Sequence, residues 1–568
     1  MADQYINMDN LKFLLHEVHH AEELFQYERF QDFDKEGADI FIDSAKDIAD
    51  KEFFPYFTEM DEKPVVYRDG KVIVHPQVGR IMQLAGENGW IGTTFDYDKG
   101  GIQLPHLLQT AANHVLESAN NSAVGYMGLT SGAASLIASF GSQELFDTYV
   151  PTMQTGKWAG TMALTEPQAG SSLSDIKTTA YPQEDGSYKI KGQKIFISGG
   201  DHEYAENFIH LTLARIEGAP AGTKGISLFV VPKHRPTENG GLEYNDVLTA
   251  GDFQKMGQRG YATTHLVYGE NNNCKGWLVG QPHNGLRYMF QMMNGARIDV
   301  GLTAASTATA AYYASLQYAK ERPQGRKLTN NGKKNAKAEQ TTIINHADVR
   351  RMLLLQKAVC EGSVSLLMEC SKYHDLSQVL TGEEAKDYHD LLELLTPIAK
   401  TYPSEMGRVS INNGLQILGG YGFCMDFPLQ QYYRDIRIMA LYEGTTGIQS
   451  LDLLGRKMTM KNGKAVGLLM QQVKEVIEGA MTHDELKPYA KQLADKLDDT
   501  QKVFQHLLQF AMKGDYETFL ADATIFMEFA STIVVAWQWL KQATIAKQML
   551  VTGSGKQTDE FYESKVHT

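Results

Sequence analysis

The sequence predicts an α+β fold in which a β domain lies between helical domains. Before about residue 158 and after about residue 283, apolar residues recur three and four positions apart, which indicates helices. Between these limits, segments rich in β-branched and aromatic residues alternate with turn clusters such as QEDG and NGG, which is typical of strands. A chain of 568 residues is long enough for several domains. We expect an N-terminal helical domain over 1–158, a middle β domain over 159–282, a helical domain over 283–460 and an additional helical domain over 461–568.

Three segments carry the helical pattern of the N-terminal domain: LKFLLHEVHHAEELF, GADIFIDSAKDIADKEF and PQVGRIMQLAGENGW. In the middle domain, SYKIKGQKIFIS, NFIHLTLARI, GISLFVVPK and THLVYG are the expected strands.

Helical periodicity returns after residue 283 in a segment of some 35 residues that ends before Pro323. A polar, lysine-rich stretch over 326–341 follows and predicts a mobile loop. Beyond it we expect a helix in DVRRMLLLQKAVCEGSVSLLMECSKY, another from about 383 to 401, a separate one through INNGLQILGG, and one that begins near Thr445. The tail after about 460 is again helical, and its last residues, TGSGKQTDEFYESKVHT, are expected to fray.

Composition excludes several classes of function. A net charge of -14 argues against nucleic-acid or anionic-membrane partners, which require a basic surface. The N-terminus lacks the basic and apolar pattern of a signal peptide, so we expect a cytoplasmic protein. The apolar stretch TIVVAWQWL is far shorter than a membrane span, and none is expected. The four cysteines are widely spaced and form no CxxC pair, which predicts neither a metal site nor a disulfide framework.

Two turns in the middle domain combine glycine with hydroxyl groups. MALTEPQAGSSLSDIKT places Gly170 and Ser171 after an expected strand, where bare N–H groups and hydroxyls suit a phosphate or the polar edge of a ring. KGQKIFISGGDHE places Phe196 two residues before Ser198, so that on a strand both side chains lie on one face and could cover a ring. An ordinary turn and a core aromatic are the alternatives.

With these turns, the ordered segments ARIDVGLTA, YAKERPQG, LQILGGYGF, YYRDIRI and YEGTTGIQ resemble the acyl-CoA dehydrogenase family of flavoproteins. The resemblance extends over residues 35–460, and the length and helical tail are similar to a larger bacterial subgroup that includes 3-methylmercaptopropionyl-CoA dehydrogenases. It implies a middle β-barrel or sandwich domain, a C-terminal four-helix bundle, and FAD as cofactor. It also implies α,β-desaturation of an acyl-CoA, with electrons passed to an electron-transfer flavoprotein.

The resemblance assigns residues to the cofactor. The first turn supplies Leu164, Thr165, Gly170 and Ser171, and the second supplies Phe196 and Ser198, where the family usually has Trp and Thr. The remaining FAD residues are Arg322, Gln416, Gly419, Gly420 and Thr445. Arg322 typically reaches the pyrophosphate of a neighbouring subunit, which implies a homodimer or a dimer of dimers and suits the bidentate chemistry of guanidinium with phosphate.

Asn294 and Arg297 match family positions that face the nucleotide part of the CoA thioester, and Gly444 is expected to lie beside the substrate. For Arg297, an ion pair within or between helices is the alternative, because arginine is seldom buried unpaired.

The resemblance makes Glu443 the general base that removes a proton from the carbon next to the thioester carbonyl. The apolar approach from Ile438 to Leu441 favours a basic carboxylate, and Gly444 gives the backbone freedom. Family members polarise the carbonyl with the backbone N–H of this glutamate. Some relatives place the base just before the arginine that matches Arg297, but Ala296 stands there in this chain. Helix capping is the alternative explanation of the Glu-Gly-Thr-Thr turn.

Rival functions remain open. His16, Glu17 and His20 satisfy the HExxH pattern of zinc peptidases, but a charged helix surface is the better explanation, because no third ligand signature follows and short patterns recur readily. An acyl-CoA oxidase, or an FAD-binding relative without activity, would have the same fold. Acyl length and branching are not determined by these motifs.

Overall fold

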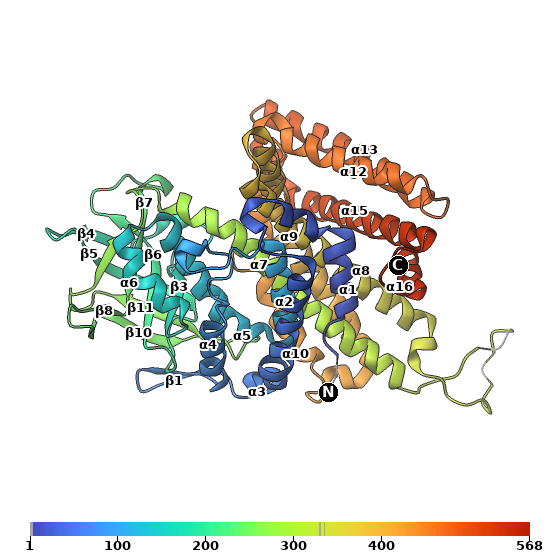
Figure 1. The fold of residues 1–568 in the computed structure, drawn as a ribbon, viewed down its shortest axis with the longest axis horizontal. Coiled ribbons are helices and arrows are strands. Elements are labelled where there is room, and N and C mark those ends of the chain that lie inside the picture. Colours follow the sequence, from blue (N-terminus) through green and yellow to red (C-terminus); the bar gives the residue numbers. More distant parts are fainter. Residues whose placement is uncertain (1–3, 329–330, 334) are drawn as a thin grey trace. The chain divides into compact units, whose positions relative to one another are not determined.

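The chain was analysed as a computed structural model that describes residues 4–328, 331–333 and 335–568, without the side chains of residues 290–294. It divides into two compact units (Figure 1). The bundle unit comprises Met1–Lys46, Pro105–Ala119 and Arg297–Thr568, and the sheet unit comprises Asp47–Leu104 and Asn120–Ala296.

The main sheet of the sheet unit runs in the order β10-β11-β5-β12-β7-β6-β3, and β4 pairs with both β5 and β6. Strands β5, β12, β7, β6 and β4 therefore close into a small barrel, as a twisted sheet does when its edges pair. Among the described strands, β6 pairs in parallel with β3 and with β4, and every other pair is antiparallel. The strands are β3 (Trp158–Ala163), β4 (Thr179–Pro182), β5 (Tyr188–Ser198), β6 (Asn207–Ile216), β7 (Ile226–Pro232), β10 (Val247–Asp252), β11 (Thr263–Tyr268) and β12 (Lys275–Leu278).

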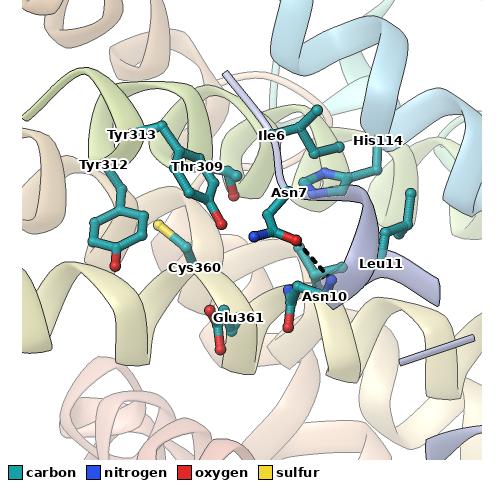
Figure 2. A pocket seen from close by; sticks show the side chains of 11 residues that line it. Ile6, Asn7, Asn10, Leu11, His114, Thr309, Tyr312, Tyr313, Cys360 and Glu361 are labelled. Atoms are coloured by element: carbon teal, nitrogen blue, oxygen red, sulfur yellow. Dashed lines mark hydrogen bonds between the residues drawn. The ribbon is translucent and has the colours of Figure 1, made fainter. Parts of the chain in front are cut away.

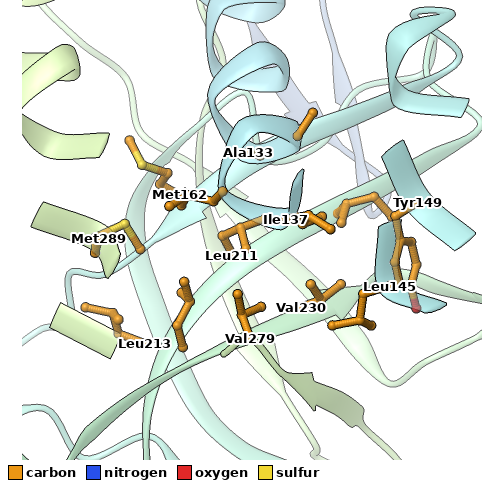
Figure 3. Packing of buried hydrophobic residues seen from close by; sticks show 14 of the residues in the cluster. Ala133, Ile137, Leu145, Tyr149, Met162, Leu211, Leu213, Val230, Val279 and Met289 are labelled. Carbon is orange, nitrogen blue, oxygen red and sulfur yellow. The ribbon is translucent and has the colours of Figure 1, made fainter. Parts of the chain in front are cut away.

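Apolar side chains pack on both faces of this sheet because alternate residues of a strand point to opposite sides. Leu211 and Val230 belong to a core shared with Ile137 of α5 and Tyr149 of α6 (Gln143–Gln154) (Figure 3). Phe229, next to Val230 in the chain, belongs to the core of the opposite face. This packing fixes the register of the strands that carry the two glycine-containing turns.

Long helices form the bundle unit (Figure 1). Helices α8 and α9 are joined by two residues and make the most extensive helix contact of the unit. The helices are α7 (Gly285–Glu321, which begins in the sheet unit), α8 (Ala347–Val379), α9 (Gly382–Leu418), α10 (Leu429–Asp435), α11 (Thr446–Asp452), α12 (Lys464–Ala480), α13 (Lys487–Met512), α14 (Tyr516–Ala521), α15 (Ala523–Thr552) and α16 (Asp559–His567).

The N-terminal third contributes helices to both units. They are α1 (Met8–Lys12), α2 (Lys35–Ile48), α3 (Phe57–Glu62), α4 (Gln77–Glu87) and α5 (His106–Phe140). Helix α5 is kinked at Asn120, whose backbone is extended (φ -161°, ψ 93°). Helices α5 and α15 are long and apolar enough to cross a membrane by length and composition, but half or more of the most apolar window of each is buried inside the protein.

Short π and 3-10 segments connect these elements. Those that matter below are η1 (Phe13–Val18), η2 (Ala21–Gln26), η10 (Gly419–Phe423), η11 (Ile436–Ala440) and η12 (Leu453–Lys457). The others are η3 (Glu28–Phe30), η4 (Ala49–Phe53), η5 (Phe54–Tyr56), η6 (Tyr97–Lys99), η7 (Leu173–Asp175), η8 (Thr223–Gly225), η9 (Ile343–Asn345) and η13 (Met460–Gly463).

Two expected helices are one. The segments predicted over 383–401 and through INNGLQILGG form the continuous helix α9, which contains Pro397 and Pro403. Pro403 cannot donate to the carbonyl of Ala399. That carbonyl instead lies against α7 at Gly301, where an added Cβ would come within 2.1 Å of it. The close approach of α7 at Gly301 therefore covers the carbonyl that lacks its partner within α9.

The end of the chain does not fray, so that prediction was wrong. Helix α16 buries Tyr562 and Lys565, and Lys565 forms an ion pair with Glu361 of α8. The Tyr562 hydroxyl donates to Glu17 at 2.8 Å. These buried polar contacts, invisible in a polar terminal sequence, hold the helix in place.

The first expected helix is broken. After α1 the backbone continues as the π-helix η1, and His20 adopts a left-handed conformation (φ 49°) before η2 begins. Every residue of η1 is buried, so no polar face is available to a regular amphipathic helix.

Sequence reasoning also missed two hairpins. One is β1 (Val66–Arg68) with β2 (Lys71–Ile73), and the other is β8 (His234–Pro236) with β9 (Leu242–Tyr244). In the first, Asp69 and Gly70 both have positive φ, as Asp-Gly does in a tight hairpin turn.

Candidate functional site

Glu443 lies in a turn between η11 and α11 of the bundle unit. Its φ is 54° and that of Gly444 is 89°, so two successive residues adopt left-handed backbone conformations. Such a conformation is unfavourable for a residue with a Cβ and persists where surrounding contacts impose it. Thr445 caps α11 by accepting a hydrogen bond from the Ile448 amide. Capping therefore explains Thr445, but it does not explain the carboxylate two residues earlier.

Two fully buried side chains hold the carbonyl groups of this turn. Gln449 donates to the carbonyl of Glu443 at 3.0 Å, and Lys400 of α9 donates to the carbonyl of Gly444 at 2.8 Å. A Cβ added to Gly444 would lie 2.5 Å from the side-chain amide nitrogen of Gln449, so only glycine fits at position 444.

The Glu443 carboxyl group is half-buried and has two cations near it. Burial raises its pKa above the ordinary value, while Arg297 and Lys400 act in the opposite direction. Arg297 of α7 is 5% exposed, and its guanidinium lies 3.7 Å from the Asp452 carboxylate of α11. The interhelical ion pair considered from the sequence is thus present, and a contact of Arg297 with CoA stays a prediction.

Glu117 is a buried acid that sequence reasoning missed. It lies on α5 and accepts a hydrogen bond from Thr303 of α7 at 3.0 Å. Burial raises its pKa well above the ordinary value, and the nearby Asp299 acts in the same direction. The charged form of Glu117 would raise the pKa of Tyr442, the residue next to Glu443. The signal was available, because one acid in the apolar segment HLLQTAANHVLES is unusual.

The residues predicted for the adenine-nucleotide half of FAD lie on exposed surface of the bundle unit. Arg322 follows α7, and its guanidinium lies 5.8 Å from the centre of the Tyr421 ring in η10. Gln416, Gly419 and Gly420 precede that tyrosine and are exposed. The structure therefore brings Arg322 next to the LQILGGYG segment, although 93 positions or more separate them in the chain.

In the sheet unit, the two glycine-containing turns meet. The Ile195 amide donates to the carbonyl of Thr165 at 2.9 Å. Lys194 is fully buried and donates to the carbonyl of Leu164 at 2.9 Å and to the carboxylate of Glu166 at 2.8 Å. Burial alone would raise the pKa of Glu166, but the Lys194 ammonium and the Lys177 amide outweigh it and lower that pKa.

This ion pair, which sequence reasoning missed, joins the first turn to β5. Both members are in the motifs TEPQAGSS and KGQKIF, whose charged residues were not considered. Gly170 and Ser171 follow on exposed surface.

Phe196 does not sit on a regular strand. Its φ is 58°, and β5 and β11 shift register between the pairs Thr264–Ile197 and Leu266–Lys194, which is a β-bulge. Strict alternation, on which we paired Phe196 with Ser198, is therefore interrupted just before them. Phe196 is 55% exposed, and the centre of its ring lies 4.5 Å from the centre of the Phe253 ring.

The remaining predicted residues contribute less. The side chain of Asn294 lies outside the described residues. His16 pairs with Asp39 at 3.1 Å and Glu17 with Tyr562. His20 lies beyond the π-helical segment as the left-handed N-cap of η2, so the HExxH spacing is not on one helical face. Among the described residues, no group of three or more potential ligands could hold a metal ion.

Two cavities lie elsewhere in the bundle unit. One, lined by Asn7, Asn10, Cys360 and their neighbours, has a volume of about 10 Å³, room for a single water molecule (Figure 2). The other, between α8, α9, α12 and α15, has a volume of about 390 Å³. Neither contains a predicted site residue of the described part of the chain.

The fold and the paired turns define the class of protein. The chain matches family models described as acyl-CoA dehydrogenase, N-terminal domain (residues 35–157), middle domain (161–270) and C-terminal domain (333–458). Residues 469–568 match a model described as acetyl-CoA dehydrogenase C-terminal like. The chain belongs to the acyl-CoA dehydrogenase family, and the α+β fold class predicted from the sequence is confirmed.

Two relatives match the chain over most of its length. The chain is 34% identical to the 3-methylmercaptopropionyl-CoA dehydrogenase of Ruegeria pomeroyi, over 90% of this chain and 86% of that protein. It is also 34% identical to a broad-specificity linear acyl-CoA dehydrogenase of Mycobacterium tuberculosis, over 100% of this chain and 94% of that protein.

Solved structures show the same fold. Caenorhabditis elegans ACDH-11 in complex with C11-CoA has a TM-score of 0.74 at 20% identity, over 92% of this chain and 86% of that one. An acyl-CoA dehydrogenase from Bacillus anthracis complexed with FAD has a TM-score of 0.72 at 22% identity, over 95% and 87%.

Proposed function

We propose that this protein is an FAD-dependent acyl-CoA dehydrogenase in which Glu443 removes the α-proton of a saturated acyl-CoA. The observation that carries the proposal is the Glu443 turn. A half-buried carboxylate with two cations near it is held in a left-handed backbone conformation by buried side chains, in a chain that belongs to this family over most of its length.

The described residues fit FAD in each unit. In the sheet unit, a Cβ added to Gly170 meets nothing closer than 4.0 Å, and the exposed Phe196 ring offers an aromatic surface for stacking. In the bundle unit, a Cβ added to Gly419 or Gly420 meets nothing within 4 Å, which leaves the backbone accessible. The exposed Arg322 suits a phosphate. Leu164, Thr165, Gly170, Ser171, Phe196 and Ser198 would hold the flavin half, and Arg322, Gln416, Gly419, Gly420 and Thr445 the nucleotide half.

When bound, FAD supplies the acceptor for the hydride that leaves the β-carbon. The Glu443 carboxylate takes the proton from the α-carbon as general base, and burial makes it more basic than an exposed glutamate. Arg297 and Lys400 favour its ionised form. The Glu443 amide donates no hydrogen bond within the described part of the chain, so it is available to stabilise the developing charge on the thioester oxygen.

Electron-transfer flavoprotein is the acceptor we propose, with oxygen, as in an oxidase, as the alternative. The substrate class remains broad, because the relatives include enzymes named for butyryl, broad linear and 3-methylmercaptopropionyl thioesters. We also propose a cytoplasmic homodimer, or a dimer of such dimers, in which Arg322 serves the partner's cofactor. Exposed apolar side chains that follow Tyr421 in the chain support this, since Phe423 is 97% and Met425 62% exposed.

One experiment tests the function. The purified protein is examined for flavin absorbance and titrated anaerobically with acyl-CoA thioesters of different length, including 3-methylmercaptopropionyl-CoA. Bleaching of the flavin by one class supports the proposal and identifies the substrate. Reoxidation by electron-transfer flavoprotein but not by oxygen separates dehydrogenase from oxidase. A flavin that no thioester bleaches would contradict the proposal.

A further inference from the structure

Lys400 is a fully buried lysine with an unusual partner. It lies on α9 between Pro397 and Pro403, in a stretch of which every residue except Tyr402 is buried. Lysine is almost never fully buried unless it is paired with a carboxylate. Within the described part of the chain, however, the only hydrogen bond of the Lys400 ammonium goes to a backbone carbonyl, that of Gly444, at 2.8 Å.

That carbonyl belongs to the turn that presents Glu443. Because the two left-handed residues Glu443 and Gly444 are disfavoured in isolation, the turn needs contacts that fix it. Gln449 holds one carbonyl from α11 and Lys400 holds the next from α9, so two helices together set the backbone position of the carboxylate.

The same ammonium acts on the Glu443 carboxylate through its charge. Lys400 and Arg297 both lower the pKa of Glu443 against the effect of burial. The pKa of Lys400 itself is lowered to about 8. Burial is the main cause, and the carboxylates of Glu443 and Glu405 act in the opposite direction. Two other ionisable groups lie near this turn. Asp452 of α11 pairs with Arg297. Tyr442 precedes Glu443, and the charges of Glu117, Glu443 and Asp299 add to the effect of burial in raising its pKa.

We propose that Lys400 is a positioning residue for Glu443, which fixes the turn by its hydrogen bond to Gly444 and keeps the carboxylate ionised by its charge. This inference depends on the proposed role of Glu443. A purely structural lysine would satisfy the Gly444 carbonyl but would leave the titration of Glu443 unchanged, and this difference makes the proposal testable.

The experiment compares the wild-type holoenzyme with Lys400→Met, Lys400→Arg and Lys400→Gln. Methionine keeps the length and removes both charge and donor, arginine keeps both, and glutamine keeps only a donor. Lys565→Met is the matched control, because it removes another buried lysine, one that pairs with Glu361 and does not contact the turn.

The first readout is infrared difference titration of the Glu443 carboxyl band, assigned by its loss in Glu443→Gln. We expect the midpoint to move up by about one pH unit or more in Lys400→Met and Lys400→Gln, the effect of losing a nearby opposite charge. It should stay unchanged in Lys400→Arg and Lys565→Met. Circular dichroism and FAD content establish folding, and if Lys400→Met does not fold, Lys400→Gln decides.

The second readout is the pH profile of flavin reduction by acyl-CoA. Its acid limb should move up by the same amount in Lys400→Met and return to the wild-type position in Lys400→Arg. An unchanged midpoint in both Lys400→Met and Lys400→Gln, or the same shift in Lys565→Met, would overturn the inference. If the wild type reduces no flavin, the proposed function fails, and the infrared titration still decides whether Lys400 controls Glu443.

Discussion

Replacing Lys194 by methionine tests how the first turn of the sheet unit is held. The substitution removes the ammonium that donates to both the Leu164 carbonyl and the Glu166 carboxylate. Glu166 is 3% exposed and keeps the amides of Lys177 and Thr178 as donors, but it loses its counter-charge.

Breaking such a buried pair costs about 3–5 kcal/mol, because one charge remains buried without its partner. Lys194→Met combined with Glu166→Gln removes both charges and should cost only about 1–3 kcal/mol, the scale of lost neutral hydrogen bonds. The double variant is therefore expected to be more stable than the single one. Glu166 has a lowered pKa in the folded protein, so its contribution is complete above the ordinary glutamate pKa of 4.5 and disappears as the pH falls through the folded value.

Urea denaturation followed by circular dichroism measures these differences, and the FAD content of the purified variants reports on the turn itself. We expect Lys194→Met to retain less FAD than the double variant. A single variant as stable as the wild type, or a double variant less stable than the single one, would refute the reasoning.

Glu443→Gln should reduce the rate of flavin reduction about 10²-fold or more, since an amide cannot act as a base, and stopped-flow reduction of the folded variant measures it. Near-normal reduction would count against Glu443. In the wild type, the rate should rise with pH through a midpoint above the ordinary glutamate pKa of 4.5, because burial raises the pKa of Glu443, and a midpoint below it would be inconsistent with the buried carboxylate. Phe423→Asp should shift the molecule toward monomers in light scattering and weaken FAD binding, whereas Ile525→Asp, at another exposed apolar position, should not. If Ile525→Asp had the same effects as Phe423→Asp, the proposed subunit interface at Phe423 would be wrong.

Most of the fold followed from periodicity. Strands β5, β6, β7 and β11 lie where β-branched segments predicted them, and α7 ends at Glu321, as the long apolar segment before Pro323 indicated. Helix α9 was divided in the prediction because proline opposes helix locally, and only the contact at Gly301 shows how Pro403 is tolerated. Tertiary contacts of this kind are not encoded in a local pattern.

The candidate site was predicted as separate motifs, and the structure adds what supports them. Glu443 was found through its resemblance to a family motif, but Lys400 is 43 positions earlier, in a helical segment that carries no motif of its own. Lys194 and Glu166 lie inside predicted motifs and were overlooked because glycine and hydroxyl residues were taken as the functional ones. Charged residues that hold backbone groups in place do not occur at a fixed spacing in the sequence, so three-dimensional contacts were needed to identify them.

The docking of α16 has a consequence for how the bundle unit opens. Asn10 and Glu17 have their partners in Lys565 and Tyr562, which lie 555 and 545 positions further along the chain. Detachment of α16 therefore leaves buried polar groups of the early segment without those partners. Local opening at α16 and local opening at the segment over 10–17 are thus expected to occur as one cooperative event.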